Sequence, residues 1–427
     1  MLTVLVIIFL VTYAAIVLEH LIGVNKSASA LVGGGLLWTI YAVTVLDSPM
    51  VNEQLNESLL ATAQIVFFLI GAMTVVEVVD AHNGFEVITR RVYTTKLSTL
   101  IWLVGFVTFF LSALLDNLTA TIVMLSLTRK LLASHEDRLY FAGVIVIAAN
   151  SGGAWSPIGD VTTTMLWIGG QITALSIMQS VILPSLISLV VPLSITAFVL
   201  RGRSVVAAPR DESDHGLHTT ELERNLMFFM GLAVLASVPV FKTVTHLPPY
   251  MGILFGLGIL WLTGDLLHRG KEDECKQHLT LAHALSRIDM SSIVFFIGIL
   301  LAVATLEHTH ILASLAQGLD HAIGRQDVMV LIIGIVSAVV DNVPLVAAAM
   351  GMYDLSQFPP GHFFWEFLAY CAGTGGSILV MGSAAGVAAM GLEKLSFFWY
   401  LRKISGLALC GYFAGAGVFL ILHYLSH

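Results

Sequence analysis

Long apolar stretches recur along the chain and are separated by short polar loops. A membrane-spanning helix needs about 20 predominantly apolar residues, and most of the stretches have that length. The pattern therefore predicts an all-α protein that crosses a membrane many times. The stretches fall near residues 1–18, 28–46, 61–79, 97–127, 140–168, 179–200, 225–241, 249–267, 291–306, 328–352, 363–391 and 404–424.

Two of these stretches carry an Asp-Asn pair near their centre. Asp116-Asn117 lies within residues 97–127, and Asp341-Asn342 lies within residues 328–352. Lys and Arg concentrate in the cytoplasmic loops of membrane proteins. Nearly all of the 20 Lys and Arg residues fall on one face only if both stretches are re-entrant hairpins, which enter and leave the membrane on the same side. We therefore expect two hairpins and about ten crossings.

The two halves of the chain resemble each other. The segment SALLDN (112–117) recurs as SAVVDN (337–342), and Gly152-Gly153 recurs as Gly375-Gly376. An odd number of crossings per half turns the second half upside down, and inverted repeats with broken helices are typical of transporters.

We expect two inverted repeats, each with five transmembrane helices, a re-entrant hairpin and a broken helix. The expected divisions are a first repeat over 1–200 (hairpin about 97–132, broken helix about 140–168), a cytoplasmic connector over 201–224, and a second repeat over 225–427 (hairpin about 328–352, broken helix about 363–391).

The composition supports this class and excludes others. Hydrophobic residues make up 57% of the chain and charged residues 11%, with a mean hydropathy of +0.89, whereas soluble domains carry about 25% charged residues. The net charge of −8 offers no basic surface to a nucleic acid. The three cysteines, Cys275, Cys371 and Cys410, lack the spacing of a zinc site or a disulfide scaffold.

Polar groups inside the apolar stretches mark a candidate transport site. An ionisable group deep in a bilayer costs roughly 2.5–3.5 kcal/mol, and non-helical backbone at that depth must be buried in protein or line a cavity. Carboxylate, amide, hydroxyl and carbonyl oxygens form the shell that a hard cation prefers. In the first repeat we expect transport or cation-binding roles for Ser112, Asp116, Asn117, Thr119, Asn150, Ser151, Asp160, Thr162 and Thr163, with Na⁺ at Asp116, Asn117, Ser151 and Asp160.

The second repeat carries fewer such groups. Ser383 stands at the place of Asp160, and Pro344 at the place of Thr119, so we expect the main cation site in the first repeat. Asp341 is then a second cation site, a proton site or a structural mirror of Asp116. The second-repeat candidates are Ser337, Asp341, Asn342, Thr374 and Ser377.

Carboxylates in a low-dielectric site hold a proton or a metal ion, but not comfortably both. That competition suffices for exchange of a cation against protons. A further set of polar residues lies near the ends of spans. They are either solvated helix ends or a proton path with a pH sensor, since histidine titrates near neutrality: Glu77, Asp80, His82, Glu307 and His308.

At these residues the chain resembles the NhaD-type sodium/proton antiporters of the ion transporter superfamily. The matching segments are SALLDNLTATIVM (112–124), ANSGGAWSPIGDVTTTMLWI (149–168), SAVVDNVPLVAAAMGMY (337–353) and GTGGSILVMGSAAGVAAMG (373–391). The resemblance implies Na⁺ or Li⁺ efflux driven by inward protons in a bacterial inner membrane. It also implies homodimers with a scaffold domain and a moving transport domain. We expect no cofactor besides the transported ions.

Three rival functions share some of these features. Sodium-coupled transport of a dicarboxylate-like or metalloid anion uses a similar architecture, but such relatives have Ser-Asn-Thr at the hairpin tips. Here Asp replaces Ser in both tips, and its negative charge repels an anion. An intramembrane aspartyl protease would need a GxGD motif, which residues 157–160 do not complete. A channel does not need carboxylates that exchange protons. We expect a transporter and not an enzyme.

Overall fold

The computed structural model describes residues 1–45, 48–89, 94–205, 219–269, 278–339 and 341–426. These residues are almost entirely helical, and Lys96 and Ser204 form an isolated antiparallel bridge. The helices up to residue 200 are α1 (Leu2–Val17), α2 (Glu19–Ile22), α3 (Lys26–Val45), α4 (Ser48–Ala81), α5 (Glu86–Thr89), α6 (Leu97–Leu115), α7 (Asn117–Leu131), α8 (His135–Ala154), α9 (Val161–Ile168) and α10 (Ala174–Val199).

The helices after residue 220 repeat this order of long, hairpin and broken helices. They are α11 (Glu221–Thr245), α12 (Pro249–Leu267), α14 (Leu281–Arg287), α15 (Met290–His308), α16 (Ile311–Ile323), α17 (Gln326–Val336), α18 (Asn342–Met352), α19 (Phe363–Gly375), α20 (Ala384–Glu393), α21 (Phe397–Lys403) and α22 (Ser405–Ser426).

The expected class of fold is confirmed. Eight of the described helices are long and apolar enough to cross a membrane. Large apolar side chains on their outer faces remain exposed, among them Phe198, Val244 and Leu262. A lipid environment explains these faces, because a helix satisfies its own backbone hydrogen bonds and then presents only side chains to the bilayer.

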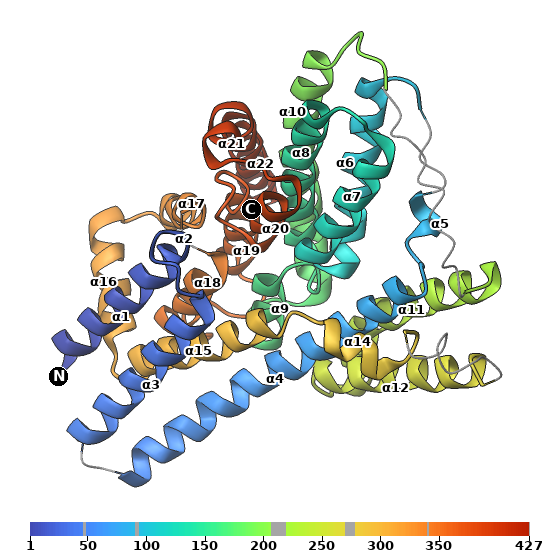
Figure 1. Ribbon diagram of the computed structural model, residues 1–427. Helices are drawn as coiled ribbons and strands as arrows, with labels where there is room; N and C mark the ends of the chain where they lie inside the picture. Colours follow the sequence, from blue (N-terminus) through green and yellow to red (C-terminus); the bar gives the residue numbers. More distant parts are fainter. Residues whose placement is uncertain (46–47, 90–93, 206–218, 270–277, 340, 427) are drawn as a thin grey trace.

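Long helices from the two halves of the chain pack on each other (Figure 1). Helix α3 packs on α15, and the corresponding helix of the second half, α12, packs on α4. Helices α10 and α22, which close the two halves, pack on each other. The inverted orientation of the halves and the divisions at 1–200, 201–224 and 225–427 stay predictions. Residues 206–218 of the connector, and Cys275, lie outside the described residues.

Helices end and restart at the Asp-Asn pairs. Helix α6 ends at Leu115 and α7 begins at Asn117, while α17 ends at Val336 and α18 begins at Asn342. Each pair of helices brings an Asp and an Asn to its tip, inside the helical assembly. The tips can therefore carry polar groups into an otherwise apolar interior.

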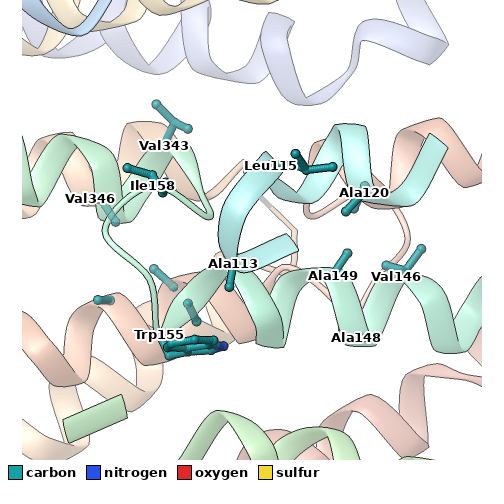
Figure 2. Packing of buried hydrophobic residues seen from close by; sticks show 14 of the residues in the cluster. Ala113, Leu115, Ala120, Val146, Ala148, Ala149, Trp155, Ile158, Val343 and Val346 are labelled. Carbon is teal, nitrogen blue, oxygen red and sulfur yellow. The ribbon is translucent and has the colours of Figure 1, made fainter. Parts of the chain in front are cut away.

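The breaks in α8–α9 and α19–α20 lie just beyond the glycine pairs, which themselves remain close to helical. Gly152 lies within α8, and its α-carbon faces the backbone of α6 so closely that a β-carbon would collide with the Phe109 carbonyl. Gly375 has the same relation to the Gly334 carbonyl of α17. The glycines thus allow each hairpin to pack directly against a broken helix. Alanines line the same contact (Figure 2), including Ala149.

Candidate functional site

Five buried polar side chains meet where the hairpin tips reach the broken helices. We call this set the polar centre: Asn117, Asn150, Asp160, Asn342 and Ser383, each no more than 5% exposed. Two come from hairpin tips, one from α8, and two from the residues that precede α9 and α20. Both halves of the chain therefore contribute to a single cluster.

Asp160 accepts most of the hydrogen bonds in the polar centre. The Asn117 amide nitrogen donates to Oδ2 of Asp160 at 2.7 Å, and the backbone N–H and hydroxyl of Thr162 donate to Oδ1 at 2.9 Å each. The Asn342 amide nitrogen lies 3.5 Å from both carboxylate oxygens. The carboxylate is thus surrounded by donors, which stabilise a buried charge.

A chain of amides extends the network into the second half. Asn117 donates its second amide hydrogen to Oδ1 of Asn150 at 3.0 Å, and Asn150 donates to the Ser383 hydroxyl at 2.9 Å. In the described part of the chain, no three His, Cys, Asp or Glu side chains gather into a metal cluster. A cation at the polar centre would therefore be held by one carboxylate together with amide and hydroxyl oxygens.

Four helices begin around the polar centre, and each is capped by a side chain from the Asp-Asn pairs or the breaks. Asp116 caps α7, Asp160 caps α9, Asp341 caps α18 and Ser383 caps α20, each through a backbone N–H of the first turn. A helix N-terminus carries partial positive charge and attracts anions. Three of the four are already supplied with a carboxylate, which leaves less attraction for an anionic ligand.

Asp116 lies at the first hairpin tip, next to the polar centre. Its carboxylate accepts from the Thr119 backbone N–H and hydroxyl, both at 2.8 Å. Its backbone has φ of 111°, a value that residues other than glycine rarely adopt. Such strain costs on the order of 1–3 kcal/mol and persists where the surroundings impose it, often at functional sites.

A cavity of about 300 Å³ leads from the first hairpin to charged residues at the end of α4. Thr119, the partner of Asp116, lines it, together with Glu77 and Asp80 of α4, Lys130 of α7 and Arg287 of α14. A second cavity, of about 220 Å³, lies between α4, α15 and α18, where Glu57, Glu307 and His308 line it. Each hairpin therefore has a cavity beside its second arm, with charged side chains in its lining.

Asp341 has different surroundings from Asp116. Its Oδ2 lies 3.0 Å from the Lys26 ammonium, at the beginning of α3, and its Oδ1 accepts from the Val343 backbone N–H at 3.3 Å. Within the described ranges, no Lys or Arg forms an ion pair with Asp116 or Asp160. Asp341 is thus paired with a cationic side chain, whereas Asp116 accepts hydrogen bonds from the uncharged Thr119.

Several predicted residues bind backbone or other side chains and do not face the polar centre. The hydroxyls of Ser112 and Ser337 donate to the Ala149 and Ala372 carbonyls and tie each hairpin to its broken helix. The Ser151 hydroxyl accepts from Ser188 of α10 at 2.8 Å. Three others donate to nearby backbone carbonyls: Thr163, Thr374 and Ser377.

The predicted proton-path residues separate into three places. Glu77 and Asp80 both contact Arg287, at 3.3 and 3.4 Å. His82 is buried and its Nε2 lies 2.8 Å from Nε2 of His268, which caps α12. In the second half, Nε2 of His308 lies 3.0 Å from the Ser58 hydroxyl.

Sequence reasoning assigned no role to three of these partners. Ser383 stands in the second half at the place that Asp160 has in the first half. That correspondence is the signal that could have placed it in the polar centre. Lys26 is one of the Lys and Arg residues whose positions indicate the orientation in the membrane, and the sequence predicts no partner for it. His268 follows an apolar stretch without any motif, and nothing in the sequence pairs it with His82.

The fold and the site together define a class: polytopic α-helical membrane proteins in which paired hairpins and broken helices enclose a buried carboxylate. The chain belongs to the citrate transporter family (CitMHS), whose family model matches residues 7–373. The resemblance found in the sequence is confirmed by relatives that are named antiporters.

Two such relatives and one solved structure illustrate the match. The chain is 50% identical to Sodium/proton antiporter 1 of Arabidopsis thaliana, over 98% of this chain and 72% of that protein. It is 30% identical to the Na(+)/H(+) antiporter NhaD of Alkalimonas amylolytica, over 97% and 89%. The YdaH transporter of Alcanivorax borkumensis has a similar fold, with a TM-score of 0.56 and 11% identity over 89% of this chain and 90% of that one.

Proposed function

We propose that this protein is a secondary antiporter that moves Na⁺ or Li⁺ out of the cytoplasm in exchange for protons. One observation carries the proposal: the buried Asp160 carboxylate is surrounded by amide and hydroxyl groups from both hairpins and from α9. The carboxylate, and the oxygens that these amides and this hydroxyl can turn toward it, are the ligand type that hard cations prefer. The relatives named sodium/proton antiporters support the same pair of ions.

The amides of the polar centre supply a way to accept and release a cation. Asn117 and Asn342 now present nitrogen to Asp160. The oxygen of an amide lies on its other arm, so a half-turn of either side chain replaces a donor with a cation ligand. A proton on Asp160 removes the charge that holds the cation. Cation and proton therefore exclude each other, and this competition couples their movements.

The second candidate is sodium-coupled transport of an organic anion, which the description of the family as citrate transporters favours. The helix N-termini of the site argue against it, because those of α7, α9 and α18 are capped by carboxylates of the chain itself. These fixed charges would repel an incoming carboxylate. We therefore rank cation exchange first.

Everted membrane vesicles with an imposed proton gradient test the proposal. Addition of NaCl or LiCl should collapse the gradient without any organic anion. Asp116→Asn should abolish this response while the protein still folds, because asparagine has the size of aspartate without its charge and its oxygen can still accept from Thr119. No response to either salt between about pH 7 and 9 would refute antiport, and a response that requires citrate would favour the second candidate.

The proposed setting is a membrane crossed many times, with the connector 201–224 on the cytoplasmic side and two copies per assembly. We propose a bacterial inner membrane as the location. Two relatives come from a plant, so the relatives alone do not fix the kind of membrane. Reporter fusions at the connector test its side. Cross-linking of the purified protein tests the dimer.

A further inference from the structure

The second hairpin carries a carboxylate that already has a cation beside it. The Lys26 ammonium lies 3.0 Å from Oδ2 of Asp341, and the two side chains are 25% and 17% exposed. Asp341 and Asp116 occupy equivalent places, since each follows the first arm of a hairpin and caps the second arm. The ammonium thus lies where the repeat would otherwise place a second cation.

The position of the Lys26 side chain is fixed by several contacts. Its backbone N–H donates to Oε1 of Glu19 at 3.1 Å, and its ammonium lies 4.5 Å from the centre of the Phe295 ring. The next residue, Ser27, donates its hydroxyl to the Ser291 carbonyl at 2.7 Å, which joins the starts of α3 and α15. The charge is therefore presented to the hairpin tip by a well-anchored helix start.

We propose that Lys26 is a tethered cation that occupies a carboxylate site at the second hairpin tip, so that the mobile ion is left to the polar centre around Asp160. The inference rests on the proposed cation transport. It assigns Lys26 a role in setting how many monovalent cations bind per chain. A side-chain ammonium and Na⁺ each bring one positive charge to a carboxylate. The Lys26 ammonium is held 3.0 Å from Asp341 by its own chain, so it takes the Coulomb attraction that would otherwise hold Na⁺ there.

Removal of the charge should therefore open the second site. Lys26→Met keeps an unbranched apolar stem that can still cover Phe295 but carries no ammonium. In equilibrium binding of radioactive Na⁺ to purified protein, we expect Lys26→Met to bind one more sodium ion per chain than the unaltered protein. Lys26→Arg keeps the charge and should show no gain. The double variant Lys26→Met/Asp341→Asn should lose the gain.

The measured quantity is the difference in the number of sodium ions bound per chain between the variant and the unaltered protein. No gain in Lys26→Met, with an unfolding temperature near that of the Lys26→Arg protein, would overturn the proposal. If Lys26→Met does not fold, Lys26→Gln supplies the same comparison. If the unaltered protein binds no sodium, the proposed antiport fails, whereas the gain or its absence in the Lys26 variant still decides this inference.

Discussion

Asn117 joins the first hairpin to the polar centre, and its replacement by alanine tests how that centre is held. The side chain is 5% exposed and donates to Oδ2 of Asp160 at 2.7 Å and to Oδ1 of Asn150 at 3.0 Å. Asn117→Ala removes both donors. It leaves Oδ2 of Asp160 with the Asn342 amide at 3.5 Å as its remaining hydrogen-bond partner among the described residues.

The size of the effect follows from these two bonds. A hydrogen bond to a charged group contributes about 1.5–3 kcal/mol, and a buried neutral acceptor left without a donor costs about 1–3 kcal/mol. We expect Asn117→Ala to lower the free energy of unfolding by about 3–5 kcal/mol. It should also weaken sodium binding by at least about tenfold, since 1.4 kcal/mol is a factor of ten and one oxygen ligand is lost.

The assay is thermal unfolding of the purified protein in detergent, with and without NaCl. A ligand at 100 times its dissociation constant stabilises the folded state by about 2.7 kcal/mol, so sodium should raise the unfolding temperature of the unaltered protein more than that of the variant. Ser126→Ala is the matched control, because Ser126 lies on the same helix, is exposed and donates to its own backbone at Ile122. If both variants unfold like the unaltered protein and respond equally to sodium, the reasoning about the polar centre is wrong.

Three further changes probe other parts of the molecule. Glu393→Gln should destabilise the protein by about 1–3 kcal/mol in the same unfolding assay, because the buried Glu393 contacts two arginines that are themselves partly hydrated. Glu221→Gln should change it by less than about 1 kcal/mol, because Glu221 is exposed and its buried partner Arg224 keeps the ion pair with Glu86. Nδ1 of His82 donates to the Val78 carbonyl, so its Nε2 accepts from His268; His268→Ala removes this hydrogen bond and should lower the free energy of unfolding by about 0.5–1.5 kcal/mol. Ser126 lines the cavity beside α7. In a chain whose native cysteines are replaced, Ser126→Cys should react with a membrane-impermeant thiol reagent added on the cytoplasmic side. Reaction from the opposite side alone would contradict the proposed orientation.

Much of the fold could be predicted because the signals are local. Helix α12 occupies residues 249–267, the range that its apolar stretch predicted, and the hairpins turn at the two Asp-Asn pairs. The broken helix is predicted over about 140–168, and the break lies between the end of α8 at Ala154 and the start of α9 at Val161. Glycine permits the close approach of α6, whereas the residues after Ala154, with Pro157 among them, end the helix.

The candidate site was predicted less completely, since the partners of each group come from distant segments. Asp160, Asn117 and Asn150 do meet. Ser151, which has the same polar character, turns toward α10 and binds Ser188. One step along a helix rotates a side chain by about 100°, so neighbours in sequence point to different helices. Only the packing decides which of them faces the polar centre.

The sequence by itself determined the membrane class, the breaks in the helices and the polar residues available at depth. It could do so because a helix in lipid must satisfy its backbone within itself, which makes each span and each break visible in a short segment. The tertiary structure alone decided the pairings. Asn342 meets Asp160, and Lys26 neutralises Asp341, across 182 and 315 residues of chain, because packing of the two halves brings those atoms together and no local pattern records it.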